Sequence, residues 1–265
     1  MKALTFTVSK GGVGKSLITA NVGAAIAKKG KKVVLVEGDT NQPLQKILGL
    51  TFPSDGAKLE DAVEKDLETE KVIYPTGIDN LSIIPSGISL QSYFEIDPIG
   101  FVRKLGEVKT DFMLIDVPFP LGKAAFLSLG FCEHFIPILT EDEIVLCVES
   151  TIDTIRLGKY LLQSTPIGFV LNRIKTAKLN DEFVKDLEDL LEIPCIGQIG
   201  EDPEVTKSYG EMGSQKAFLA YGKLPQSDFA HRIDGLATWL VDQKLGNGRK
   251  DVIKLLNEVT KPLEN

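Results

Sequence analysis

The sequence predicts an α/β fold, a mostly parallel twisted β-sheet flanked by helices on both faces. Three observations support this. Short apolar runs alternate with longer stretches of helical periodicity along the chain. Several of the short runs are almost continuously apolar, which is typical of strands covered on both faces. A glycine-rich segment follows the first run and opens a helical stretch, as in strand–loop–helix units that bind phosphate.

The predicted elements alternate in order along the chain. The strands are expected at residues 3–8, 32–36, 81–85, 112–115, 135–139, 167–171 and 195–199. The helices are expected at residues 15–29, 42–48, 98–106, 144–162, 181–191, 203–209 and 227–244. Gly246-Asn247-Gly248 then interrupts the helical pattern. We therefore expect a main domain at 1–245 and a C-terminal segment at 246–265 that consists of a hinge and a short helix.

Composition restricts the class of protein. The chain has 265 residues and a formal net charge of −7, which disfavours non-specific binding to nucleic acid. Its cysteines, Cys132, Cys147 and Cys195, form no CxxC pair, so neither a disulfide scaffold nor an iron–sulfur cluster is expected. No signal peptide precedes the first strand, and no apolar run approaches the roughly 20 residues that cross a bilayer. We expect a cytoplasmic protein, attached at most to a membrane surface.

The strongest motif is the glycine-rich segment Ser9-Lys10-Gly11-Gly12-Val13-Gly14-Lys15-Ser16. Glycines let a backbone wrap around phosphate groups with its N–H groups pointing inward, and the positive end of the following helix faces the same anion. We expect the Lys15 ammonium to reach the β- and γ-phosphates and the Ser16 hydroxyl to bind Mg²⁺.

This segment resembles the signature of the MinD/ParA family of deviant Walker-A ATPases, whose mark is a second lysine at the position of Lys10. The resemblance extends over roughly residues 2–240. It implies that two subunits enclose two ATP molecules and that Lys10 contacts the partner's nucleotide, whereas Lys15 serves its own subunit. The residues expected at the nucleotide in this loop are Lys10, Gly11, Gly12, Val13, Gly14, Lys15, Ser16 and Leu17.

Further segments match the family in order. Asp39 follows a predicted strand, at the position where the family carries the carboxylate that orients the attacking water. The resemblance therefore implies this role for Asp39, and we expect it to lie near Mg²⁺ as well. Asp116 ends an apolar strand, a Walker-B pattern that acts through Mg²⁺-bound water. By resemblance, Asn172 reads the adenine edge with Arg173 beside it, and Pro203 belongs to the segment that closes over the base and ribose. The expected cofactors are ATP or ADP with Mg²⁺.

Three positions depart from the family pattern. Leu17 stands where a second threonine is usual, and only its backbone N–H remains for the α-phosphate. Glu37 replaces the first aspartate of the usual Asp-x-Asp. The switch II segment after Asp116 has extra residues before Gly122. These departures leave the rate of hydrolysis open.

The C-terminal segment bears on what the ATPase controls. Apolar residues recur there at helical spacing: Val252, Leu255, Leu256, Val259 and Leu263. Basic residues outnumber acidic ones by two over 249–261. A short helix of this kind can lie on an anionic membrane, as the C-terminal helix of MinD proteins does, pack on the domain, or form an interface with a partner. We favour a MinD-like ATPase that forms an ATP-dependent homodimer, responds to an activating protein and contacts a membrane through residues 249–263. A ParA-type partitioning ATPase and a metal-centre maturation ATPase are the alternatives.

Overall fold

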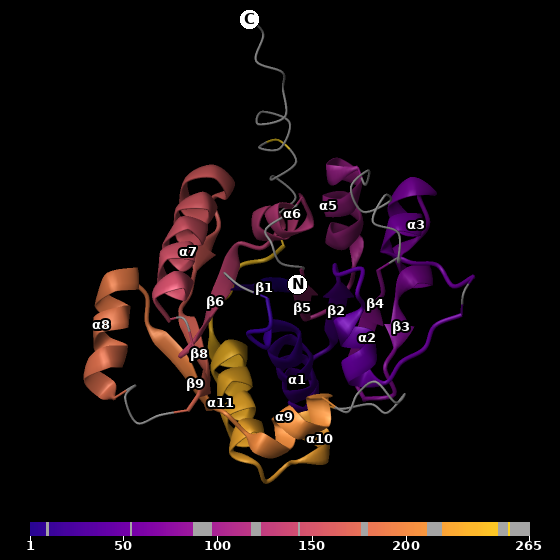
Figure 1. Ribbon diagram of the computed structural model, residues 1–265. Coiled ribbons are helices and arrows are strands. Elements are labelled where there is room, and N and C mark those ends of the chain that lie inside the picture. The colour runs from indigo at the N-terminus through magenta and orange to yellow at the C-terminus, as the bar shows by residue number, and fades with distance from the viewer. Residues whose placement is uncertain are drawn as a thin grey trace, which may run out of the picture.

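The computed structural model describes residues 1–8, 11–53, 55–86, 97–117, 123–142, 144–175, 180–210, 219–248 and 254. Its centre is a nine-stranded sheet with the order β3-β4-β2-β5-β1-β6-β8-β9, and β7 pairs with β6 (Figure 1). The strands are β1 Lys2–Val8, β2 Val33–Glu37, β3 Tyr74–Pro75, β4 Leu81–Ile84, β5 Phe112–Asp116, β6 His134–Thr140, β7 Thr165–Pro166, β8 Phe169–Ile174 and β9 Cys195–Gly200. Every pairing between these strands is parallel except that of β3 with β4. The predicted fold class is confirmed.

Helices cover both faces of the sheet. They are α1 Lys15–Lys28, α2 Pro43–Leu48, α3 Leu59–Glu64, α5 Pro98–Glu107, α6 Lys123–Phe131, α7 Ile144–Leu157, α8 Asp181–Leu191, α9 Pro203–Gly210, α10 Ala220–Lys223 and α11 Asp228–Asp242. A 3₁₀ turn, η1 Thr69–Val72, and a π-helical turn, η2 Gly158–Leu162, complete the described elements. One layer holds α1, α2, α10 and α11, and the other holds α3, α5, α6, α7 and α8 (Figure 1).

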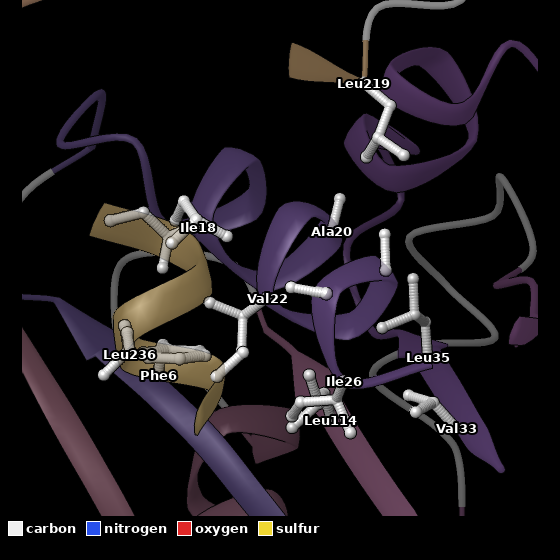
Figure 2. Packing of buried hydrophobic residues seen from close by; sticks show 14 of the residues in the cluster. Phe6, Ile18, Ala20, Val22, Ile26, Val33, Leu35, Leu114, Leu219 and Leu236 are labelled. Atoms are coloured by element: carbon white, nitrogen blue, oxygen red, sulfur yellow. The ribbon is translucent and has the colours of Figure 1, made fainter. Parts of the chain in front are cut away.

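Alternation along the strands divides the core in two. Leu35 and Leu114 point to the α1 layer, whereas Val34 and Met113 on the same strands point to the opposite layer. Both sets are buried, because successive side chains of a strand face opposite sides of the sheet. Figure 2 shows α1 lying across Phe6 and neighbouring residues of the α1 layer. This packing fixes α1, and with it the loop that precedes α1, against the carboxyl ends of the central strands.

The strand order reverses on either side of β1. The chain leaves β1 toward β2 and β4 on one side and later fills β6, β8 and β9 on the other. In open α/β sheets the ligand crevice lies outside the carboxyl ends of the strands at such a switch point. The glycine-rich loop follows β1 directly, so the topology places it at this crevice.

Several predicted bounds differ from the structure. The predicted helix at 144–162 divides into α7 and η2 at Gly158, where an added Cβ would lie 2.7 Å from the Phe135 ring and 2.9 Å from the Ser164 carbonyl oxygen. The predicted strand at 167–171 lies further along, so Asn172 is inside β8 and pairs with Thr140. Neither α6 nor the antiparallel β3 was predicted.

The described start of the C-terminal segment contacts the beginning of the chain. Asn247 forms a β-bridge with Lys2, and the Gly248 N–H donates to the Met1 carbonyl oxygen at 3.2 Å. Residues 249–253 and 255–265 lie outside the described residues, and Lys254 is exposed. No helix in the described part of the chain has the length and apolar character needed to span a membrane.

Candidate functional site: a phosphate loop and an adjoining cavity

The glycine-rich loop ends in a turn that only glycine accommodates. Gly14 has a left-handed backbone with φ 88°, and its carbonyl oxygen accepts the first hydrogen bond of α1, from Ile18 N at 2.9 Å. A Cβ on Gly14 would lie 2.6 Å from the Asn172 side-chain nitrogen. Backbone conformation and space therefore both require glycine here. Ser9 and Lys10, including the predicted signature lysine, lie outside the described residues.

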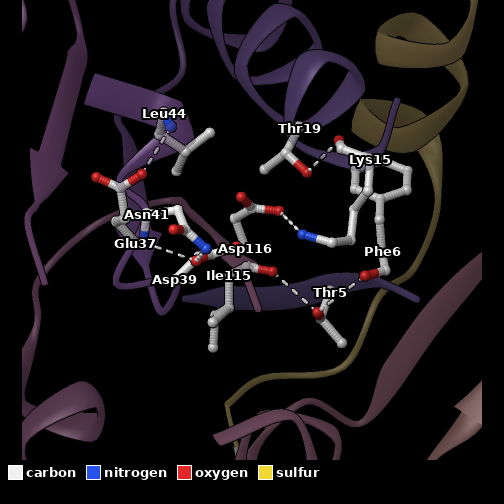
Figure 3. A network of polar contacts seen from close by, with 10 residues as sticks. All are labelled: Thr5, Phe6, Lys15, Thr19, Glu37, Asp39, Asn41, Leu44, Ile115 and Asp116. Atoms are coloured by element: carbon white, nitrogen blue, oxygen red, sulfur yellow. Dashed lines mark hydrogen bonds and ion pairs between the residues drawn. The ribbon is translucent and has the colours of Figure 1, made fainter. Parts of the chain in front are cut away.

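Lys15 lies in the first turn of α1 and points toward the end of β5. Its ammonium donates to one carboxylate oxygen of Asp116, and both side chains are buried (Figure 3). The other carboxylate oxygen, Asp116 Oδ2, is buried and has no hydrogen-bond partner among the described residues. Because a buried polar atom without a partner is costly, Asp116 Oδ2 marks a place where a ligand or ordered water belongs. The predicted Lys15 and Asp116 are thus brought together.

Asp39 lies on the turn between β2 and α2, beside this pair. The Gly38 N–H donates to the Asp116 carbonyl oxygen at 2.7 Å, which ties the turn to β5. A Cβ on Gly38 would lie 2.9 Å from that same carbonyl oxygen, so this close approach also requires glycine. The half-buried Asp39 accepts hydrogen bonds from the backbone and side chain of Asn41 at 2.8 and 3.0 Å (Figure 3).

Glu37 points away from this turn and holds α2. Its carboxylate accepts from Leu44 N at 2.6 Å and from Gln45 Nε2 at 2.7 Å, and the side chain is fully buried. It therefore caps the helix from the preceding strand, because the helix's own N-cap residue, Gln42, makes no side-chain cap. Burial raises the pKa of Glu37 from 4.5 to about 8; the bonds from Gln45 and Leu44 oppose this rise, and the nearby Asp116 carboxylate adds to it.

A cavity of about 300 Å³ opens beside the phosphate loop. Its walls come from the loop, from α1, from the end of β8 and from the β9–α9 region, and include Gly14, Leu17, Asn172, Arg173, Glu201 and Tyr209. The structure thus gathers the predicted Leu17, Asn172 and Arg173 around one space. Leu17 also packs against the hydrophobic core, so its side chain gives this wall an apolar patch.

Asn172 and Arg173 contact the phosphate loop itself. Asn172 Nδ2 donates to the Val13 carbonyl oxygen at 2.7 Å, and Arg173 Nη1 donates to the Gly12 carbonyl oxygen at 3.4 Å. Arg173 also forms an ion pair with Glu201 at 3.6 Å. These contacts were not predicted, since the sequence pattern indicated only a reader of the base.

The remaining predicted residues are placed less centrally. Gly11 is exposed and precedes Gly12, whose carbonyl oxygen accepts from Arg173. Ser16 is half-buried and follows Lys15, which contacts Asp116. Pro203 is exposed and lines an adjoining depression with Lys175, rather than the 300 Å³ cavity.

Tyr209 and Phe229 line the cavity and were missed. Burial raises the pKa of the Tyr209 phenol, and the carboxylates of Asp116 and Asp39 raise it further, so this side chain lies within electrostatic reach of these two carboxylates. Neither residue belongs to a sequence motif. For Tyr209, the only signal was an aromatic side chain in a predicted helix close to the predicted base-binding segment.

A glycine loop after a buried strand, a lysine in the first turn of the next helix and an aspartate at the end of the neighbouring strand define a phosphate-binding-loop protein. The chain belongs to the CobQ/CobB/MinD/ParA nucleotide binding domain family, whose profile matches residues 4–214. The family assignment agrees with the resemblance found in the motifs.

Similar proteins extend over most of the chain. An uncharacterized ATP-binding protein of Methanocaldococcus jannaschii is 32% identical over 98% of this chain and 95% of its own. The structure of the septum site-determining protein MinD of Pyrococcus horikoshii, complexed with Mg-ADP, has a TM-score of 0.75 and 26% identity, covering 91% of this chain and 96% of that one. The chromosome-partitioning ATPase Soj of Treponema pallidum is 36% identical over 53% of this chain and 58% of its own. Relatives of both the MinD and the ParA type are therefore found.

Proposed function

We propose that this protein is a MinD-like ATPase that binds Mg-ATP, dimerises around it and hydrolyses it slowly as a spatial or assembly switch. The observation that carries the proposal is the continuity of the site. Lys15, which pairs with Asp116, directly follows Gly14, and Gly14 lines the cavity together with Asn172. The similarity to a MinD solved with Mg-ADP supports the nucleotide.

The residues present fit a magnesium nucleotide. Asp116 offers a buried carboxylate oxygen that no described residue satisfies, and a Cβ placed on Gly11 or Gly12 would meet no atom within 4 Å. Open space thus lies against a backbone rich in N–H groups. Ser16 and Asp116 are the residues that would hold Mg²⁺, which would neutralise phosphate charge when bound. Lys15, which pairs with Asp116 in this structure, would then bind phosphate oxygens.

Asp39 is the proposed acid for hydrolysis. Its side chain is half-buried on a turn that the Gly38–Asp116 contact fixes beside Asp116. A carboxylate held there orients a water molecule, and positioning of this kind accounts for most of phosphoryl-transfer catalysis. Lys10 is proposed to complete the partner subunit's site. A slow basal rate, raised by an activating protein, is consistent with the replacement of the usual threonine by Leu17.

The C-terminal residues 249–263 are proposed to contact an anionic membrane. Asn247 pairs with Lys2 at the start of β1, whereas the phosphate loop follows the other end of this seven-residue strand. At about 3.3 Å per residue, the segment therefore begins roughly 20 Å from the loop, at the opposite edge of the sheet. A membrane contact there leaves the nucleotide face available to a second subunit.

The ParA-type alternative is favoured by the Soj relative and disfavoured by the net charge of −7. One experiment separates the two functions. The full chain is sedimented with vesicles containing an anionic lipid, and in parallel its binding to double-stranded DNA is measured, each with ATP and with ADP. We expect ATP-dependent sedimentation that deletion of residues 249–265 abolishes, and no DNA binding. ATP-dependent DNA binding without sedimentation would replace this proposal by the ParA-type function.

A further inference from the structure

We propose that Asn172 and Arg173 are positioning residues of the phosphate loop, in addition to facing the base. They hold two consecutive carbonyl groups of the loop from the side and so set the orientation of its phosphate-binding N–H groups. This inference rests on the proposed nucleotide site and deepens it, because it links recognition at the cavity to binding at the phosphates.

The contacts come from adjacent residues of β8 to adjacent residues of the loop. The Asn172 amide donates to the Val13 carbonyl oxygen at 2.7 Å, and the Arg173 guanidinium donates to that of Gly12 at 3.4 Å. Asn172 is only 5% exposed and lies against Gly14, where no Cβ could be accommodated. The Asn172 side chain is therefore fixed by packing as well as by its hydrogen bond.

Because of peptide geometry, contacts that hold the loop carbonyls also orient the loop N–H groups. In a planar trans peptide the C=O and N–H groups point in opposite directions. When the Gly12 and Val13 carbonyls point toward β8, the N–H groups of Val13 and Gly14 must point away from it. Backbone N–H groups that converge in this way form an anion-binding concavity. The two side chains thus select one of the many orientations that a glycine-rich loop can adopt.

The backbone of Arg173 carries independent support. Its φ is 56°, in the left-handed region, which is uncommon for a residue other than glycine. Such a conformation persists where the surroundings hold it in place, and it clusters at functional sites. Here the guanidinium lies between the Gly12 carbonyl and Glu201, and the Glu201 N–H donates to the Ile174 carbonyl oxygen at 2.9 Å. The loop, β8 and the start of the β9–α9 segment are joined through Arg173.

The hydrogen bond to the loop uses only part of the hydrogen-bonding capacity of the Asn172 amide. An amide carries two N–H hydrogens and a carbonyl oxygen, and the bond to Val13 uses one hydrogen. The second hydrogen and the oxygen remain for a base in the cavity that Asn172 lines. Reading the base and holding the loop are therefore compatible in one side chain.

The test uses a ligand without a base. Affinities for Mg-ATP and for Mg-tripolyphosphate are measured by competition against a fluorescent ATP analogue, on the full chain and on Asn172→Ala. We expect the substitution to weaken Mg-tripolyphosphate binding roughly three- to tenfold, the effect of one well-formed hydrogen bond. The loss for Mg-ATP is expected to be larger, because it adds the loss of the base contact. Arg173→Met, which keeps an unbranched apolar stem and removes the guanidinium donors, is expected to weaken tripolyphosphate binding about twofold, since the contact of Arg173 is longer and more exposed.

Asn180→Ala is the matched control. Asn180 caps α8 by accepting from Phe183 N at 2.9 Å, so its loss lowers stability without reaching the site. We expect its tripolyphosphate affinity to equal that of the full chain. If tripolyphosphate does not compete on the unsubstituted protein, ATP and AMP are compared, and the loss on Asn172→Ala must be larger for ATP.

The outcomes distinguish this inference from the proposed function. A weakened affinity for Mg-ATP with unchanged affinity for tripolyphosphate, or equal losses for ATP and AMP, would show that Asn172 only reads the base. Absence of Mg-ATP binding by the unsubstituted protein would overturn the proposed function itself.

Discussion

At the scale of single residues, the pairing of Lys15 with Asp116 is the most consequential contact of the site. A buried ammonium and a buried carboxylate hold each other in place, and under the proposed function phosphate and Mg²⁺ would replace these partners. We predict that Lys15→Ala abolishes Mg-ATP binding in a calorimetric titration, because the phosphates lose their central cation. It also leaves Asp116 buried without a partner, which costs about 3–5 kcal/mol of unfolding free energy.

Lys29→Ala provides the control for this substitution. Lys29 follows the other end of α1 and pairs with Asp234 at 3.0 Å, in a partly exposed ion pair. Removing it is expected to leave Mg-ATP affinity unchanged. An affinity of Lys15→Ala within twofold of the unsubstituted protein would contradict the assignment of Lys15 to the phosphates.

Glu37 makes stability depend on pH in a direction opposite to that of most carboxylates. Its pKa is 4.5 in the unfolded chain and about 8 in the folded one, so between these values the folded protein retains a proton that the unfolded chain has released. Raising the pH through this window therefore lowers the free energy of unfolding, by at most about 1.4 kcal/mol per pH unit. Glu37→Gln keeps an acceptor for Leu44 N and removes the titration.

The prediction concerns the difference between the two proteins. In urea unfolding with EDTA at pH 5.5, 7 and 8.5, Glu37→Gln is expected to gain stability relative to the unsubstituted chain as the pH rises, with little further change above pH 8. A constant difference across the three pH values would mean that Glu37 does not hold its proton in the folded state.

At the scale of elements, those with a strong local signal were predicted and those defined by distant contacts were not. The β1–loop–α1 unit was recognisable because its glycines and helix start are adjacent in the sequence. The start of η2 within the predicted 144–162 helix was not, because it depends on Gly158 packing against Phe135 on another strand. α6 was missed because its apolar residues do not lie on one helix face and so give no amphipathic period. Leu127 and Phe131 pack in one buried cluster, and Leu129 packs in another.

Two glycines within helices show how close packing decides what an element tolerates. Gly23 lies in α1 against the sheet, and a Cβ there would be 2.7 Å from Leu35 Cδ2, whereas a Cβ on Gly235 in α11 would meet no atom within 4 Å. We predict that Gly235→Ala raises the unfolding free energy by about 0.5–1 kcal/mol, through higher helix propensity. Gly23→Ala is expected to lower it by about 1 kcal/mol, since overpacking outweighs the same gain.

Urea unfolding of the two single variants measures both effects under identical conditions. Equal stabilisation by both substitutions would mean that α1 or the Leu35 side chain can shift to admit a methyl group. That result would also weaken the argument that packing of α1 fixes the phosphate loop.

At the scale of the whole molecule, the sequence pointed to residues that the structure brings together, but not to the contacts between them. Lys15, Asp116 and Asn172 were predicted from motifs that lie about 100 and 60 residues apart, and the parallel sheet brings them to one edge. The hydrogen bonds from Asn172 and Arg173 to the loop were not predictable, because side-chain donors to a backbone carbonyl leave no sequence pattern. Tyr209 was also missed, because it belongs to no motif and only the fold brings α9 to the cavity.

The phosphate loop and the described start of the C-terminal segment, residues 246–248, lie at opposite ends of β1, and this placement leads to a prediction about the assembled protein. If two subunits enclose ATP at one end of these strands, each would contribute a C-terminal segment at the other end. Paired weak membrane contacts would then gain avidity that can reach about 10²–10⁴-fold.

Asp39→Ala should bind ATP without hydrolysing it and so remain dimeric. We expect light scattering after gel filtration with Mg-ATP to show a dimer for Asp39→Ala and a monomer for Lys15→Ala. Asp39→Ala should also sediment with anionic vesicles at lower protein concentration than the unsubstituted chain. Turnover by Asp39→Ala at the unsubstituted rate would exclude its catalytic role, and a persistent monomer with bound ATP would exclude coupling between nucleotide and assembly.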